Sequence, residues 1–373
     1  MTDINKASQQ LIKESNMKLV FGLIHSHGTI SRADIKKITG LSATTVSSLV
    51  EELMADKLVV ECGVKETKTS GRKAVMLTVN SQDGFFVGLD VRKNIIYAAL
   101  CGLDFSVKQT AEVTVAKGET LVLGILRAIG SLARGKRVFA ITIGIPGVID
   151  PKTNTLISST VLAAEDAKDM YLILRETMPD VSIFIKNNSG LMALCEREFD
   201  GYQHIDNLVS VDIDDGVGAG ILIGGAIYDG SGLAGEFGHM SVDINGRRCN
   251  CGNYGCLELY ASIPAMLQQS GADSVENLKI MLDANDAIAS SAIDKVARAL
   301  AFGINNIVNL LDPELIVIGG AVRGLGDVFL NRVQANFEEL SLIQNKTIVY
   351  SEIDENPVVL GGVRYAFDML FGM

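Results

Sequence analysis

Three cysteines lie within eight positions of the segment RCNCGNYGCLE, which runs from Arg248 to Glu258. They are Cys249, Cys251 and Cys256, and thiolates this close together in sequence are typical ligands of a metal ion. A metal held there could catalyse a reaction, shape a finger that reads nucleic acid, or brace a loop. Which role applies depends on the elements that position the cysteines.

His239 lies ten residues before Cys249 and adds an imidazole to the three thiolates. Together they make a closed Cys3His set for a tetrahedral ion, which leaves no position for a catalytic water. A DNA-reading finger is disfavoured because GCLELYASI offers no basic reading positions after the last cysteine. We therefore expect a structural Zn²⁺ ion bound by His239, Cys249, Cys251 and Cys256. The alternative is three buried structural thiols without a metal.

The composition indicates an ordinary globular chain. Its 373 residues are 48% hydrophobic and 21% charged, enough for two or three domains with their own cores. No apolar run approaches the roughly 20 residues that span a bilayer, and MTDINKASQQ lacks the pattern of a signal peptide. We expect a cytoplasmic protein with reduced thiols and no membrane partner.

The charge is distributed unevenly along the chain. Residues 1–80 hold 11 Lys and Arg against 8 Asp and Glu, whereas the remainder holds 22 against 36. Nucleic acid repels an acidic surface, so any contact with DNA is expected in the first 80 residues.

Two helices are predicted before residue 41. The first runs from Leu11 to Ser26, with Ile12, Leu19, Val20, Leu23 and Ile24 at partly helical spacing. The second is SRADIKKITG, in which Ser31 is the expected N-cap, Ile35 and Ile38 form the inward face, and Gly40 ends the helix.

A third helix follows in LSATTVSSLVEELMADKLV. Ser42 is its expected N-cap, and its buried stripe comprises Val46, Leu49, Val50 and Leu53. Its outer face is small, uncharged and rich in hydroxyls, which suits a recognition helix that enters the major groove. The residues predicted to contact DNA here are Ser42, Ala43, Thr44, Thr45, Ser47 and Ser48. The alternative is a helical hairpin with a solvated face.

Two short strands, Leu58–Glu61 and Ala74–Val79, flank the polar stretch GVKETKTSGRK. A basic hairpin after a helix-turn-helix is typical of a winged helix, and Arg72 and Lys73 would reach the DNA backbone or minor groove. The first 80 residues are thus predicted to form a winged helix-turn-helix.

From Gly84 onward, short β-branched runs that end in Gly or Asp alternate with helical stretches, which is typical of an α/β fold. FFVGLDV, VFAITIGIPG, NLVSVDI and ELIVIGG are examples. The chain resembles the ROK family, and within it the repressor branch, through GIPGVID (144–150), IVIGG (316–320) and above all AGEFGHMSVDINGRRCNCGNYGCLE (234–258). The resemblance implies a two-lobed, actin-like and ribonuclease-H-like body with a sugar site.

The resemblance also implies where kinase chemistry would lie. The family's kinases have an aspartate base after an asparagine, but IKNNSG places Asn187 and Asn188 there. An amide cannot take the proton of a sugar hydroxyl near neutral pH, although it can bond that hydroxyl. Both phosphate loops depart as well, with Arg92 and Lys93 in DVRKN and with Asp214 and Asp215 in DIDDGVGAG. We expect no kinase activity.

The sugar-binding positions of the family are better kept. Glu236 and His239 match its substrate-contacting pair, Glu258 matches a third contact, and Asn187 and Asn188 complete the predicted sugar site. Carboxylates, imidazole and amides can each pair with the hydroxyls of a polyol. However, TVLAAEDAKDMYL, which follows the GIPG loop, does not show the family's usual Asn-Leu-x-Trp-like stretch. The sequence therefore does not say which sugar binds or whether that sugar carries a phosphate.

Taken together, these features predict a sugar-responsive repressor that binds operator DNA as a homodimer or homotetramer. The expected domains are a DNA-binding head (1–80), a first lobe (81–190 with about 300–373) and a second lobe (191–300) with a zinc loop at 236–258. Two alternatives are a ROK sugar kinase with an appended DNA-binding domain and a scaffold whose body binds another protein and no sugar.

Overall fold

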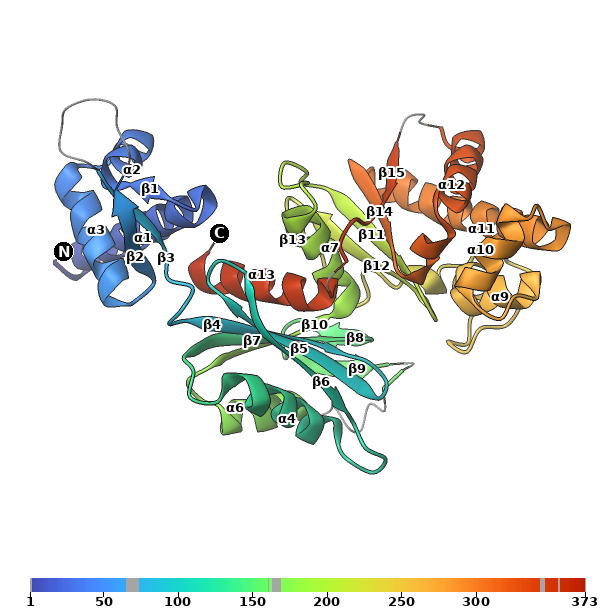
Figure 1. Ribbon diagram of the computed structural model, residues 1–373, viewed down its shortest axis with the longest axis horizontal. Helices are drawn as coiled ribbons and strands as arrows, with labels where there is room; N and C mark the ends of the chain where they lie inside the picture. Colours follow the sequence, from blue (N-terminus) through green and yellow to red (C-terminus); the bar gives the residue numbers. More distant parts are fainter. Residues whose placement is uncertain are drawn as a thin grey trace. The chain divides into compact units, whose positions relative to one another are not determined.

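The computed structural model describes residues 2–64, 74–159, 161–162, 169–342, 346–354 and 356–372. The chain forms two compact units, each with a five-stranded sheet (Figure 1). The first comprises Met1–Ile143, Asp169–Phe184 and Gly362–Met373, and the second Gly144–Lys168 and Ile185–Gly361. No helix in the described ranges is both long and apolar enough to cross a bilayer.

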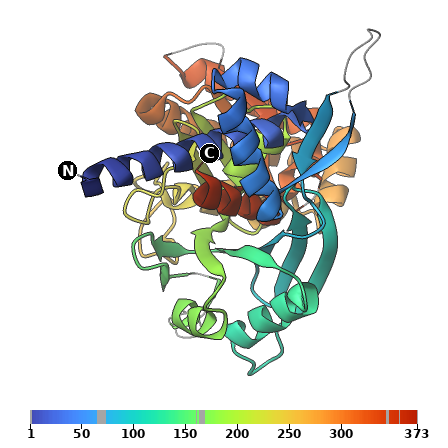
Figure 2. The same cartoon turned by 90° about the vertical axis from the view of Figure 1, so that its left-hand side faces the viewer.

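The first unit begins with three helices and a small sheet. The helices are α1 (Thr2–His27), α2 (Arg32–Thr39) and α3 (Ala43–Ala55), and the sheet has the order β1-β3-β2 from β1 (Ile30–Ser31), β2 (Val59–Val64) and β3 (Val75–Val79). Strands β2 and β3 pair antiparallel as a hairpin, drawn in lighter blue in Figure 2. We call residues 2–64 and 74–79 the head.

The predicted ends of α2 and α3 are confirmed. Ser31 Oγ accepts a hydrogen bond from the backbone N–H of Asp34 at 3.2 Å, and Ser42 Oγ accepts one from Thr45 at 3.0 Å. Gly40 ends α2 in the left-handed conformation, with φ of 71°. Because these caps satisfy backbone groups that the helices leave open, two short helices can follow each other closely.

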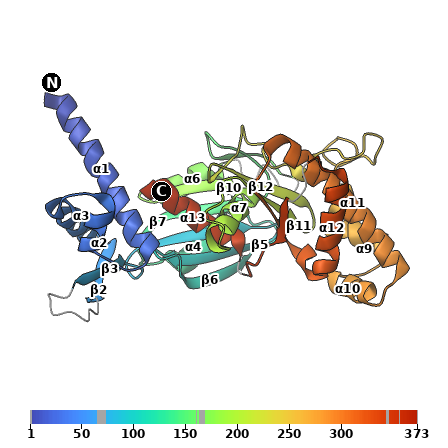
Figure 3. The same ribbon diagram turned by 90° about the horizontal axis from the view of Figure 1, so that it is seen from above.

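The buried stripe of α3 is also as predicted, but one apolar residue of α2 is not. Val46, Leu49, Val50 and Leu53 are all buried, whereas Ile38 is 52% exposed. The two-turn helix α2 packs through Ile35, so Ile38 lies beyond the edge of the contact. In α1, Ile12 and Leu19 are exposed too. Ile12 lies in the N-terminal half of the helix, which projects past α2 and α3 (Figure 3), and Leu19 lies next to the buried Val20.

The large sheet of the first unit has the order β10-β7-β4-β5-β6. Its strands are β4 (Phe85–Val91), β5 (Ile95–Gly102), β6 (Val107–Thr114), β7 (Val138–Ile145) and β10 (Ser182–Asn187). Helices α4 (Leu121–Ala133) and α6 (Met170–Thr177) cover one face, and α13 (Pro357–Phe371) lies on the other (Figure 1).

The sheet of the second unit has the order β13-β12-β11-β14-β15. Its strands are β11 (Leu208–Ile213), β12 (Val217–Ile223), β13 (Ala226–Ile227), β14 (Leu315–Gly319) and β15 (Thr347–Tyr350). Strand β11 pairs antiparallel with β12 and parallel with β14. A separate two-stranded sheet joins β8 (Val148–Asp150) and β9 (Thr155–Ser158).

Helices cover both faces of this sheet, as the alternation along β12 shows. Gly218 and Gly220 face Ser189 of α7 (Asn188–Phe199), whereas Val217 and Ala219 belong to the apolar core on the opposite face. That core includes α9 (Ile263–Ser270), α10 (Val275–Asp283), α11 (Ala287–Leu311) and α12 (Asp327–Leu340). The described part of the unit also contains three short helices, η1 (Phe237–His239), α8 (Glu258–Ala261) and η2 (Ala321–Leu325).

The two large sheets repeat one strand order. In each, three consecutive strands lie side by side and two later strands add next to the first of them, which agrees with the expected ribonuclease-H-like pair. The observed units differ from the predicted lobes in two places. Residues 144–168 and 185–190, which were predicted in the first lobe, belong to the second unit. Residues 300–361 belong to the second unit, because β14 and β15 extend the sheet of β11, and only α13 from Gly362 onward returns to the first.

Candidate functional site

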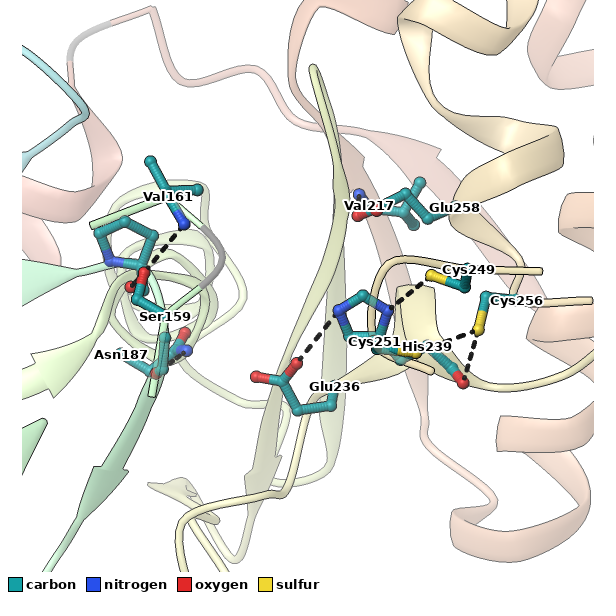
Figure 4. A network of polar contacts seen from close by, with 12 residues as sticks. Ser159, Val161, Asn187, Val217, Glu236, His239, Cys249, Cys251, Cys256 and Glu258 are labelled. Atoms are coloured by element: carbon teal, nitrogen blue, oxygen red, sulfur yellow. Dashed lines mark hydrogen bonds and ion pairs between the residues drawn. The ribbon is translucent and has the colours of Figure 1, made fainter. Parts of the chain in front are cut away.

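The four side chains predicted to bind a metal lie together in the second unit. Their ligand atoms are all within 4.8 Å of one another. Cys249 Sγ is 3.8 Å from His239 Nδ1, and Cys251 Sγ is 3.6 Å from Cys256 Sγ (Figure 4). Bond lengths of about 2.3 Å to sulfur and 2.0 Å to nitrogen require tetrahedral ligands to be roughly 3.5 to 3.8 Å apart. The cluster therefore has the dimensions of a metal site.

The acid–base chemistry of the cluster also fits a cation. Burial and the neighbouring thiols raise the pKa of Cys256 to about 12, so without a metal this thiol stays protonated. A bound dication has the opposite effect, because it stabilises the thiolates that coordinate it. The residues present can hold a metal. A bound cation would explain why three thiols and an imidazole lie so close together.

His239 presents its two ring nitrogens to different neighbours. Nδ1 faces the cysteines, whereas Nε2 lies 3.9 Å from Oε2 of Glu236 (Figure 4). A metal on Nδ1 would fix the ring orientation and leave Nε2 available to a ligand. The geometry thus allows one imidazole to serve both predicted roles.

Two glycines hold Glu236 in place against β12. A Cβ atom on Gly235 would lie 2.2 Å from the carbonyl oxygen of Ala219, and one on Gly238 would lie 2.2 Å from that of Val217. Gly235 also has φ of 91°, which side chains disfavour. Burial raises the pKa of Glu236; His239 opposes this effect, and Glu258 adds to it.

Glu258 begins α8 two residues after the last cysteine. Its Oε2 accepts a hydrogen bond from the backbone N–H of Val217 at 3.3 Å (Figure 4). The loop that contains the three cysteines and strand β12 therefore position Glu258 together. The structure brings Glu236, His239 and Glu258 to one end of β12, as the proposed sugar contacts require.

Asn187 belongs to a second network and has a structural task that the sequence reasoning missed. Its Oδ1 accepts the backbone N–H of Ser189 at 2.8 Å, which caps α7, and its Nδ2 donates to the carbonyl oxygen of Gly147 at 2.9 Å. The amide thereby ties the start of α7 to the loop after β7. Asparagine directly before a helix is a typical N-cap, so the sequence held a signal for this role. Asn188 is the first residue of α7 and is half-buried.

Comparison with known proteins places the chain in a family. The model of the ROK family matches residues 86–359. The chain belongs to the ROK family. The match covers both large sheets and the metal cluster, and it ends inside α13.

Relatives within the ROK family extend the similarity to the head. A putative xylose repressor of Caldicellulosiruptor sp. (strain Rt8B.4) is 32% identical, over 96% of this chain and 97% of its own. The crystal structure of a ROK family transcriptional regulator, described as a homologue of the E. coli MLC protein, has a TM-score of 0.82, with 26% identity over 96% and 97% of the chains. A ROK hexokinase from Thermus thermophilus shares the fold, with a TM-score of 0.68 and 23% identity over 78% of this chain and 100% of its own.

The residues at the ROK phosphate loops have local partners. Arg92 Nε lies 2.9 Å from Oδ2 of the buried Asp90, and its guanidinium lies 5.0 Å from the ring centre of Tyr97. In the second unit, Oδ1 of Asp214 accepts the backbone N–H of Ala321 at 2.7 Å, and Asp215 is exposed.

The predicted DNA-binding residues of the head lie on the first turns of α3. Ala43, Thr44 and Ser48 are exposed, and Thr45 and Ser47 are half-buried. Ser42 is exposed as well, but its hydroxyl serves as the N-cap. Arg72 and Lys73, the predicted wing contacts, lie outside the described residues.

Proposed function

We propose that the protein is a sugar-responsive transcriptional repressor that acts in the cytoplasm as a homodimer. The observation that carries this proposal is similarity along the whole chain, since the putative xylose repressor aligns with 96% of it, head included. A ROK kinase such as the Thermus thermophilus hexokinase covers 78% and shares only the fold. A repressor therefore accounts for more of the chain than a kinase does.

The head would read operator DNA as a winged helix-turn-helix. Helix α3 follows α2 after a short turn at Gly40, and the hairpin of β2 and β3 would serve as the wing. The exposed Thr44 and Ser48 would face base edges or phosphates in the major groove, while Arg72 and Lys73 of the wing would contact the backbone. A two-fold dimer would present two such heads to a palindromic site.

The effector would be a sugar held by polar groups of the second unit. On one side, the hydroxyls of the sugar would bond to Glu236, Glu258 and Nε2 of His239. On the other side, they would bond to Asn188 and to the second lone pair of Asn187 Oδ1, whose first accepts the N–H of Ser189. A structural Zn²⁺ ion on His239, Cys249, Cys251 and Cys256 would lock the imidazole so that Nε2 points to the sugar. Because an effector shifts an equilibrium only by its differential affinity, the sugar must bind one head arrangement more tightly.

The same residues argue against phosphoryl transfer. Asn188 has no basic lone pair to take a proton, Arg92 folds onto Asp90, and two carboxylates, Asp214 and Asp215, would face the phosphates. Coupled ADP release on a panel of hexoses, pentoses and amino sugars tests the kinase alternative. Turnover above background on any sugar would establish the kinase.

Operator binding tests the repressor proposal directly. The full-length protein is titrated onto a palindrome from upstream of its own gene at several salt concentrations, with and without D-xylose. Thr44→Glu, which adds a negative charge to the outer face of α3, should weaken binding at least about tenfold. Ser131→Glu on the exposed face of α4 adds the same charge away from the head and should leave affinity unchanged. Salt-independent binding, or equal effects of both variants, would count against the proposal.

Metal analysis tests the zinc brace. We expect one zinc per chain in the protein as purified and a loss of that zinc in Cys256→Ser. The variant should lose the rise in melting temperature that the effector sugar produces, yet still bind the operator, because all four proposed zinc ligands lie outside the head. Zinc-free protein with a normal sugar response would refute the brace.

A further inference from the structure

We propose that α13 carries the effector signal from the second unit to the head. The inference rests on the proposed function, since it takes α7 as the effector side and the head as the DNA-binding part. Helix α13 is continuous from Pro357 to Phe371, and the division between the two units falls within it, between Gly361 and Gly362. One helix therefore belongs to both units.

The effector-side end of α13 packs tightly on α7. A Cβ atom on Gly361 would lie 1.8 Å from the backbone oxygen of Leu191, so the two helix backbones meet at a distance that only glycine permits. Leu191 lies one turn after Asn188, the first residue of α7 and a proposed sugar contact. Val359 and Leu360 are buried beside this contact. Because there is no spare space between Gly361 and Leu191, a displacement of the first turns of α7 must move α13. We call this contact the effector-side joint and the contact of Phe371 with α1 the head-side joint.

The other end of α13 packs on α1 of the head. The ring of Phe21 on α1 lies 4.6 Å from that of Phe371 and 5.9 Å from that of Phe367. Phe21 and Phe367 are fully buried. Tilted aromatic rings at these distances form a directional, well-packed contact. The head is thus attached to the last turns of α13 by side chains as well as by the chain itself.

A single polar side chain sets the orientation of this contact. The ring of His25 on α1 lies 4.4 Å from that of Phe367 and 4.7 Å from that of Phe105, and its Nε2 lies 3.0 Å from the carbonyl oxygen of Leu103. This partly buried hydrogen bond is lost if α1 rotates, whereas apolar contacts alone tolerate such a rotation. His25 therefore defines one preferred position of α1 on α13.

Two features of α13 and its surroundings would permit a second position of its last turns. Two consecutive glycines, Gly361 and Gly362, lie in the middle of α13, and glycine pairs are common points of bending in helices. A groove of about 400 Å³ lies where α1, α3 and the end of α13 meet, and Phe21, Leu53 and Phe371 contribute to its lining. Leu53 belongs to α3, the proposed recognition helix. A shift of Phe371 into this groove would change the packing of α3 against α13.

The test measures coupling rather than binding alone. Operator affinity of the full-length, zinc-loaded protein is measured by fluorescence anisotropy with and without saturating D-xylose, and the ratio of the two dissociation constants is the response. Gly361→Ala changes the effector-side joint and Phe371→Ala changes the head-side joint. Met369→Ala, on the same helix but 54% exposed, is the matched control. Thermal shift with D-xylose reports effector binding in each variant.

We expect a wild-type response of about fivefold or more, retained by Met369→Ala and reduced below about twofold in both joint variants, which should still bind D-xylose and operator. An unchanged response in the joint variants would overturn the inference while leaving the proposed function intact. A wild type that binds neither D-xylose nor operator would instead refute the proposed function, and the inference with it. If Gly361→Ala does not fold, Phe371→Ala near the helix end decides the result.

Discussion

Glu196 on α7 makes the stability of the second unit depend on pH. The residue is 1% exposed, and its Oε2 has no hydrogen-bond partner among the described residues. Burial raises the pKa of Glu196 to about 7; Asp200 adds to the shift, and a hydrogen bond from Ser351 and the charge of Arg323 oppose it. The carboxyl is therefore partly protonated at neutral pH.

The size and sign of the effect follow from this shift. In the unfolded chain the carboxyl has its ordinary pKa of 4.5, so between pH 4.5 and about 7 the folded state holds a proton that the unfolded state has lost. The free energy of unfolding falls as the pH rises through this window. The difference between a pKa of 4.5 in the unfolded chain and one of about 7 in the folded chain corresponds to about 3 kcal/mol of unfolding free energy. Glu196→Gln removes the titration, so we expect the variant to be up to about 3 kcal/mol more stable than the wild type at pH 8.

Urea unfolding at several pH values between 4.5 and 8 provides the assay. The curve of unfolding free energy against pH should be flatter for Glu196→Gln than for the wild type, and the two should converge near pH 4.5. Glu339→Gln, whose side chain on α12 is 73% exposed, is the control and should follow the wild type. Parallel curves for Glu196→Gln and the wild type, or a less stable variant at pH 8, would refute the assignment of a raised pKa.

Two further predictions concern the head. Ser42→Ala removes the N-cap of α3, so it should destabilise the head by about 1 kcal/mol and weaken operator binding. Ser42→Asp can also cap the helix, so it should restore the stability measured by urea unfolding, but it should not restore operator binding, because its charge would face the DNA. Burial lowers the pKa of His25, so the contact between α1 and α13 is at full strength above pH 6.5 and weakens as the pH falls through the depressed pKa. The protection factors of the α1 amides, which correct for the pH dependence of intrinsic exchange, should therefore fall on acidification in the wild type and not in His25→Phe; a fall of equal size in both would contradict this.

The local structure of the head could be predicted closely because its signals are local. Ser31, Gly40 and Ser42 act on backbone groups three or four residues away, so these residue types are sufficient to place both ends of α2 and the start of α3. The exposure of Ile38 could not be predicted in this way. It depends on where a two-turn helix meets its neighbours, and an apolar residue carries no information about that contact.

The candidate site was predictable to a different degree. The cysteines and His239 are close in sequence, and glycine-rich loops between them allow few other arrangements, so their convergence followed from spacing. The bond from Asn187 to Gly147 and the contact of Gly361 with Leu191 join residues 40 and 170 positions apart. Such contacts are set by the packing of whole elements, for which a single sequence contains no direct signal. The lobe boundary near residue 300 was misplaced for the same reason.

The aromatic contact between α1 and α13 also orders events during synthesis. Phe21 is synthesised some 340 residues before its partners Phe367 and Phe371. The contact of α1 with α13 therefore cannot form until the strands and helices between them have been made. Under the proposed coupling, the effector would control the head only after α13 has been synthesised.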